Sequence, residues 1–114
     1  MTTIETGSVV IVHCSGPREK LWGLLVRIDA VGAVVRGMDL SSVEDWIRQE
    51  ARGEPPSIGP ATFLVPTHRL VRVDLDESGP MVEGFADRYR ELCGRDVRTA
   101  LGRDPNPSAD GLPA

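Results

Sequence analysis

The stretch "LWGLLVRIDAVGAVVRG", residues 21–37, contains two apolar segments rich in β-branched residues, separated by a short turn. Within the turn, Gly32 can adopt positive φ, and Asp29 is expected to bond its own hairpin backbone. The pattern predicts a tight hairpin between strands at residues 20–28 and 33–38. Upstream, "SVVIVHC" at residues 8–14 is another β-branched segment that ends at a Gly-Pro turn. We therefore expect a meander of three antiparallel strands.

From Ser41 onward, the spacing of apolar residues changes from that of a strand to that of a helix. The segment "SSVEDWIRQEARG" places an apolar stripe that includes Trp46 at helical spacing. Ser41 and Glu44 form a capping-box pattern, and Gly53 is suited to the end of a helix. These signals predict a helix over residues 41–52, inserted between the third and fourth strands. The proline-rich "EPPSIGP" that follows is expected to be a loop.

The second half of the chain returns to strand and then to helix. "ATFLVPTHRLVRVDLD" predicts two short strands with a sharp bend at residues 66–68. Apolar residues of "MVEGFADRYRELCG" recur every three or four positions, which predicts a helix over residues 81–93. Asp96 is expected to cap one further turn through Leu101. Residues 102–114 are rich in Pro, Gly and Asp and are predicted to be a disordered tail.

These elements define an expected fold. The chain has 114 residues, which fits one compact domain, assigned here to residues 1–101. Five short strands in a meander, with a sharp bend between the fourth and the fifth, predict a mostly β protein with two helices. The expected architecture is a small five-stranded SH3-like or Sm-like barrel with a C-terminal helix, because a closed sheet hides its edge strands.

Composition limits the function classes. Apolar residues make up 40% and charged residues 26% of the chain, as in ordinary globular proteins. No apolar stretch approaches a membrane span and no secretory signal is visible, so we expect a cytoplasmic protein that contacts no membrane. Cys14 and Cys93 are expected to be reduced, and no metal-ligand spacing or cofactor motif is present. The net charge of −4 is opposite in sign to that of a typical nucleic-acid binder.

Two short motifs resemble those of a known family. "GLLVRID" resembles the G-x-L-x-x-x-D core of the first Sm motif, at Gly23, Leu25 and Asp29. "VPTHRLVRV" resembles the second Sm motif in the form found in the bacterial RNA chaperone Hfq, with His68 before the last strand. The resemblance covers residues 8–75. It implies a barrel whose fourth strand pairs with the fifth strand of the next subunit in a ring.

The same resemblance implies RNA binding, but less strongly than it implies the fold. Ala33 stands where the family has a base-contacting Asn, and Pro66 and Thr67 replace the usual residues of the second motif. The candidate RNA-binding residues are His68, Arg69, Arg18 and Lys20. For each of them the alternative is a solvent-facing turn side chain.

The residues do not favour catalysis. His13 and Cys14 are adjacent in a strand and therefore point to opposite faces, so they cannot form a nucleophile-base pair. Our first hypothesis is a non-catalytic interaction or scaffold protein that self-assembles, and the alternative is an RNA-binding Sm-like ring. Trp46 is expected either to cover a strand edge within its own subunit or to dock on a neighbour. The candidate oligomer interface consists of Trp46, Phe63, Val65, Val71 and Val73.

Overall fold

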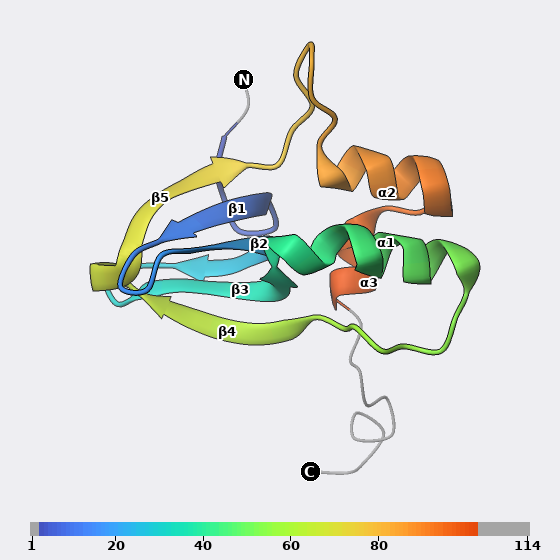
Figure 1. The fold of residues 1–114 in the computed structure, drawn as a ribbon. Helices are drawn as coiled ribbons and strands as arrows, with labels where there is room; N and C mark the ends of the chain where they lie inside the picture. The colour runs from blue at the N-terminus through green and yellow to red at the C-terminus, as the bar shows by residue number, and fades with distance from the viewer. Residues whose placement is uncertain (1–2, 103–114) are drawn as a thin grey trace, which may run out of the picture.

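A five-stranded antiparallel sheet forms the centre of the protein, whose residues 3–102 are described by the computed structural model (Figure 1). The strands lie in the order β4-β3-β2-β1-β5. The predicted meander of the first three strands is confirmed, and so is the sharp bend before β5, which is a short 3-10 helix, η2 (Thr67–Arg69). The strands are β1 (Val9–Cys14), β2 (Glu19–Ile28), β3 (Gly32–Asp39), β4 (Ala61–Pro66) and β5 (Leu70–Leu75).

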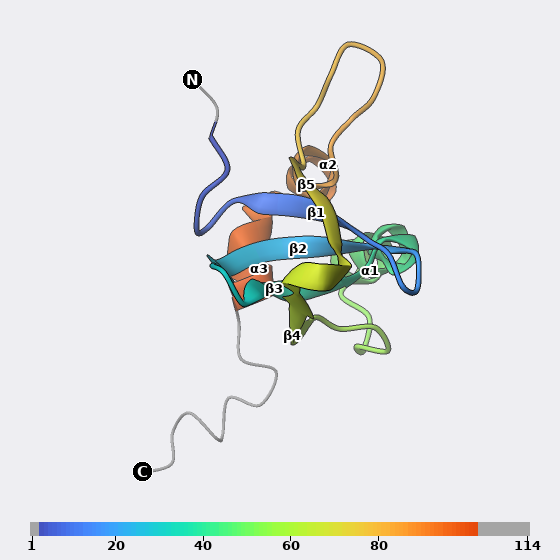
Figure 2. The ribbon, with the colours of Figure 1, turned by 90° about the vertical axis from the view of Figure 1, so that its left-hand side faces the viewer.

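The sheet is open, so the predicted SH3-like or Sm-like barrel is wrong. Within residues 3–102, β4 pairs only with β3 and β5 only with β1, and the two end strands do not pair with each other. The chain passes through η2 from β4 at one end of the curled sheet to β5 at the other end, where β5 pairs with β1 and not with β4 (Figure 2). Each end strand therefore keeps one open edge.

The concave face of the curled sheet holds its own hydrophobic core. Leu25, Val35 and Val65 have at most 1% of their surface exposed, although no helix is part of this cluster. Because all five strands contribute to it, the curl must bring the apolar side chains of β4 and β5 toward each other. Members of this cluster from β1 and β5 are Val10, Val12, Cys14, Leu70, Val73 and Leu75.

Glycines permit the close approach of strands on this face. Gly23 and Gly37 lie directly opposite each other on β2 and β3. A Cβ atom at Gly37 would lie 1.9 Å from the carbonyl oxygen of Trp22, so no other residue fits. In the hairpin, Gly32 has a φ of 158°, and a Cβ there would lie 2.2 Å from the carbonyl oxygen of Val65.

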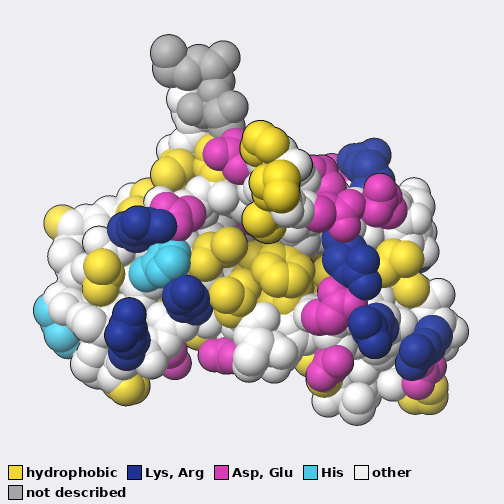
Figure 3. Space-filling view, turned by 45° about the horizontal axis from the view of Figure 1, so that its top comes forward, with side chains coloured by type: hydrophobic (Ala, Val, Ile, Leu, Met, Phe, Trp, Pro, Cys, Tyr) yellow, Lys and Arg dark blue, Asp and Glu magenta, His cyan; other side chains and the backbone are white. Residues whose placement is uncertain are grey.

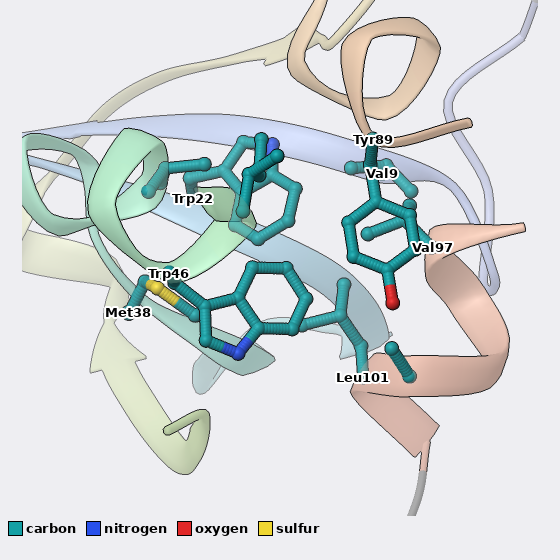
Figure 4. Close-up of a cluster of buried hydrophobic side chains, with 10 residues drawn as sticks. Val9, Trp22, Met38, Trp46, Tyr89, Val97 and Leu101 are labelled. Atoms are coloured by element: carbon teal, nitrogen blue, oxygen red, sulfur yellow. The ribbon is translucent and has the colours of Figure 1, made fainter. Parts of the chain in front are cut away.

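The helices lie together beside one end of the sheet and form a second core with its other face (Figure 1). They are α1 (Val43–Arg52), α2 (Phe85–Cys93) and α3 (Val97–Gly102). Trp46 of α1 stacks on Tyr89 of α2, with 5.3 Å between ring centroids, and its ring centroid lies 5.8 Å from that of Trp22 of β2 (Figure 4). This aromatic cluster joins the sheet to the helices.

The helix inserted between β3 and β4 is confirmed, but its predicted N-cap is wrong. The carboxylate of Asp39 accepts a hydrogen bond from the backbone N–H of Ser41, which starts a 3-10 turn, η1 (Leu40–Ser42). The α-helix therefore begins at Val43, and Ser42 makes no side-chain cap. The helix ends at a left-handed Gly53, as predicted.

The helix predicted over residues 81–93 is α2, and it begins at Phe85 instead of residue 81. The carboxylate of Asp76 accepts hydrogen bonds from the backbone N–H groups of Phe85 (2.9 Å) and Ala86 (2.8 Å), so it caps the helix there. The further helical turn is also present as α3, with Asp96 accepting from the N–H of Arg98. Gly102 is the last residue of α3, and the rest of the predicted tail lies outside the described residues.

Glu44 joins α1 to α2 by an ion pair. Its carboxylate accepts from Nε of Arg88 at 2.6 Å and from Nε of Arg48 at 2.8 Å. The hydrogen bond from Arg88 is the main cause that lowers the pKa of Glu44 from 4.5 to about 2. The capping-box role predicted for Glu44 is therefore replaced by a bond between helices.

Replacing Glu44 with glutamine should lower the free energy of unfolding by about 1 kcal/mol at neutral pH, because partial exposure of the pair weakens it. Since folding lowers this pKa, the stabilisation is complete above pH 4.5 and is lost as the pH falls toward about 2. Urea unfolding followed by tryptophan fluorescence at several pH values measures the difference. Glu54→Gln, at an exposed ion pair with Arg52, is the control. If Glu44→Gln lowered the free energy of unfolding by the same amount at neutral and at acidic pH, the ion pair of Glu44 would not be the source of the stabilisation.

Candidate functional site

The open edge of β4 presents unpaired backbone groups. The N–H of Thr67 donates to the carbonyl of Val31 at 3.0 Å, and Val65 pairs with Ala33 two residues earlier. In an antiparallel ladder, alternate residues point their N–H toward the partner strand. Val65 therefore directs its N–H into the sheet, and Leu64 directs its N–H to the open edge. The same alternation places the N–H of Thr62 on the open edge.

The open edge of β5 has the same character. The N–H of Asp76 donates to the carbonyl of Val9 at 2.9 Å, and Leu75 pairs with Val10. By the same alternation, Val73 and Leu75 direct their backbone N–H groups away from β1. The molecule thus has two six-residue edges, one at each end of the sheet, that no described residue covers with a strand.

The β4 edge lacks the usual protection of edge strands. Natural sheets protect open edges with charged side chains, proline or bulges. The sequence of β4, "ATFLVP", has no charged residue, and its proline stands only at the last position. Leu64 is 50% exposed in the middle of the strand. By contrast, β5 carries Arg72 and Asp74, and its pairing with β1 has an irregular register.

The predicted interface residues are divided between core and surface. Trp46 and Val65 are buried within the chain itself, so their side chains offer no surface to a second copy. Phe63 and Val73 are half-buried and pack against the concave core. Val71 is 63% exposed. The structure therefore leaves the strand edges, together with Leu64 and Val71, as the accessible part of this surface.

The structure brings the predicted RNA-binding residue Arg69 to the turn that carries Arg18 and leads into Lys20. The guanidinium of Arg69 donates to the carbonyls of Ser15 (3.1 Å) and Pro17 (2.9 Å) and to the carboxylate of Glu19 (2.8 Å). Its donors are therefore used to hold the turn between β1 and β2. Arg18, Lys20 and His68 are exposed, and no side-chain hydrogen bond or ion pair joins them to another described residue.

Two neighbouring rows of side chains on the helix-facing side of the sheet were not predicted. The register places Lys20, His13 and Arg72 side by side across β2, β1 and β5. His13 Nε2 lies 2.8 Å from the carboxylate of Asp74, to which Arg72 also donates. The next row contains Ile11 between Asp74 and the buried Trp22. Sequence reasoning missed this arrangement because His13 and Asp74 are 61 positions apart.

Carboxylates line a hollow near the N-terminus, and two of them are bonded to structural groups. Its lining includes Glu5, Asp76, Asp87 and Arg98. Asp76 is bound to backbone N–H groups and to the Trp22 indole, and Asp87 accepts from the Ser78 hydroxyl. Among residues 3–102, no group of three or more His, Cys, Asp and Glu side chains is placed to hold a metal ion. Cys14 and Cys93 are both free, and burial raises the pKa of each thiol.

The protein thus belongs to the class of small proteins that contain both strands and helices, with an open, curled antiparallel sheet packed against three helices. Comparison with protein-family models, with curated proteins and with solved structures gives no match. In the part of the chain that the structure describes, none of the helices has the length and apolar character needed to cross a membrane.

Proposed function

We propose that this protein is a non-catalytic interaction module that self-assembles by pairing the open edge of β4 with the open edge of β5 in a second copy. The observation that carries this proposal is the uncharged, unprotected edge of β4 with Leu64 exposed in its middle. Such an edge is a template for another strand, because its unpaired N–H and C=O groups gain partners in the ladder.

The β5 edge is a suitable partner. Both edge strands have six residues, and each directs alternate N–H groups away from its own sheet. Exposed apolar side chains, Leu64 on β4 and Val71 on β5, would be removed from water in the joined sheet. Because the two edges differ, the contact is heterologous and each copy would use both of its edges.

RNA binding is the second candidate function, and it is less favoured because the guanidinium of Arg69 is already bound by Ser15, Pro17 and Glu19. Arg69 donates to the turn between β1 and β2, and Arg18, Lys20 and His68 are exposed on that turn, on β2 and on η2. The test of self-assembly also tests this alternative, because phosphate contacts weaken steeply as salt is added.

The test measures molar mass by light scattering at increasing protein concentration. The wild-type chain is expected to exceed its monomer mass of 12.4 kDa at micromolar concentration. Leu64→Pro removes an outward N–H without breaking a bond to β3, so it should abolish edge pairing. Leu64→Thr keeps that N–H and is the matched control. A wild-type chain that stays monomeric at high micromolar concentration overturns the proposal, and a salt-sensitive mass increase with poly-U or poly-A would indicate RNA binding.

A further inference from the structure

The last turn of α3 lies close to the open edge of β4 (Figure 1). Arg36 of β3 contacts both elements: its Nε donates to the carbonyl of Leu101 at 3.0 Å, and its guanidinium donates to the hydroxyl of Thr62 at 3.4 Å. Leu101 precedes Gly102, the last residue of α3, and Thr62 is the second residue of β4. The residues that follow Gly102 in the sequence therefore start one arginine side chain away from this edge.

Residues 103–114 are long enough to cover the edge. A strand rises about 3.3 Å per residue, so six extended residues span about 20 Å. That is the length of β4, which has six residues. Since α3 ends beside Thr62, near the start of β4, a strand formed by these residues would run along β4 in the same direction. It would thus add a parallel strand to the sheet.

The prolines of this segment all stand at odd-numbered positions. They are Pro105, Pro107 and Pro113. In a strand, successive N–H groups point to opposite sides, so every proline can face away from β4 while Asn106 and Ser108 direct their N–H groups toward it. Sheets accept proline on an edge strand when the missing N–H is on the solvent side. The segment can therefore bond to β4 and leave an outer edge that offers few donors to a further strand.

The same alternation places a proline beside Leu64. Phe63 and Val65 pack against the concave core, so Leu64 points to the other face of the sheet. In a parallel pair, a residue whose N–H points toward the partner strand lies beside a residue whose N–H points away. Leu64 directs its N–H to the open edge, and its neighbour would therefore be an odd-numbered residue such as Pro105 or Pro107. A proline ring there would remove from water part of the Leu64 side chain, which is 50% exposed.

Main-chain bonds and apolar contact would hold the segment in place. On the face of the molecule shown in Figure 3, charged side chains of both signs flank the hydrophobic ones. β4 differs, because none of its residues is charged and its open edge offers the backbone groups of Thr62 and Leu64. An occupant of this edge is therefore selected by its own pattern of N–H groups, and residues 103–110 have a suitable pattern.

We propose that residues 103–110 bind the open edge of β4 in their own chain as a parallel strand and compete there with the β5 edge of a second copy. The consequence for assembly rests on the proposed edge pairing. Because the segment belongs to the same chain, its effective concentration at the edge does not depend on protein concentration. Asp, Asn, Gly and Pro are unfavourable in strands, so the segment covers only a fraction of the edges and leaves the rest open to a second copy.

Hydrogen exchange, resolved to single amides, tests the cover in the full chain at a concentration where light scattering gives the monomer mass. The amides of Thr62 and Leu64 report it, because they point to the open edge. Asn106→Pro removes an N–H that faces β4 and should speed exchange of these two amides roughly threefold or more. The matched control is Ala109→Pro, which removes an N–H that faces away and should leave exchange unchanged. Circular dichroism verifies that both variants are folded.

Light scattering gives a second readout. Asn106→Pro should assemble at a concentration roughly threefold or more below that of the wild type, because a larger fraction of its chains has an open edge, and Ala109→Pro should match the wild type. Equal exchange of the Thr62 and Leu64 amides in the wild type and in Asn106→Pro overturns the cover and leaves edge pairing standing. Protection that appears only as protein concentration rises assigns the edge to a second copy alone and also overturns the cover. If Asn106→Pro speeds exchange in a chain that never assembles, the cover stands and edge pairing is wrong.

Discussion

Replacing Leu25 with aspartate is expected to unfold the protein. The Leu25 side chain has no exposed surface and lies in the concave core to which all five strands contribute. Removing a buried leucine side chain costs about 2–5 kcal/mol, and an unpaired carboxylate in an apolar core adds a further desolvation cost. The total stability of a domain of this size is only about 5–15 kcal/mol.

The neighbouring residue provides a matched control for Leu25→Asp. Val26 is 42% exposed and lies where the register between β2 and β3 shifts. Val26→Asp should therefore change the free energy of unfolding by about 0.5 kcal/mol or less. Far-ultraviolet circular dichroism and thermal melting measure both variants. Equal melting temperatures for Leu25→Asp and the wild type would show that the concave face is not a packed core.

The hairpin between β2 and β3 could be predicted because its signals are local. Asp29 accepts a hydrogen bond from the N–H of Val31, two positions away, and Gly32 stands at the turn where the sequence pattern required it. The apolar stripe of α1 was predictable for the same reason, since Val43, Trp46 and Ile47 recur at helical spacing and are all buried. Local spacing therefore identified the elements of the fold.

Closure of the sheet could not be predicted from local spacing. Whether β4 and β5 pair depends on the direction in which η2 sends the chain and on the curl of the whole sheet. The start of α2 was also misplaced, because its cap is Asp76, nine positions before Phe85 in the chain. Helical periodicity extends back to residues 81 and 82, but the carboxylate of Asp76, the residue after β5, caps the helix at Phe85 and Ala86.

The candidate site was only partly predictable, because distant contacts decide which side chains remain accessible. Trp46 has the pattern of an interface residue, but Tyr89 and Trp22 cover it within the same chain. The bonds of Arg69 to Ser15 and Pro17 span more than fifty positions of sequence. From the sequence, the outer edge of the fourth strand was identified only through the resemblance to the Sm motifs, and that resemblance stays a prediction that these observations do not test.

The carboxylate of Asp76 accepts three hydrogen bonds that join the sheet to α2. It accepts from the N–H of Phe85 at 2.9 Å, from the N–H of Ala86 at 2.8 Å and from Nε1 of Trp22 at 3.1 Å. These bonds satisfy the start of α2 and the polar atom of an indole that has no exposed surface. Asp76 therefore joins the end of β5, the centre of β2 and α2.

Replacing Asp76 with alanine is expected to lower the free energy of unfolding by about 2–4 kcal/mol, since a helix cap is lost and a buried indole N–H is left unsatisfied. Urea unfolding measures the loss, and hydrogen exchange locates it, because the amides of Phe85 and Ala86 should lose protection before the strand amides do. Glu77→Ala, at the next and exposed residue, is the control and should have little effect. An Asp76→Ala protein that keeps both its stability and the protection of these two amides would show that α2 is held by its apolar contacts alone.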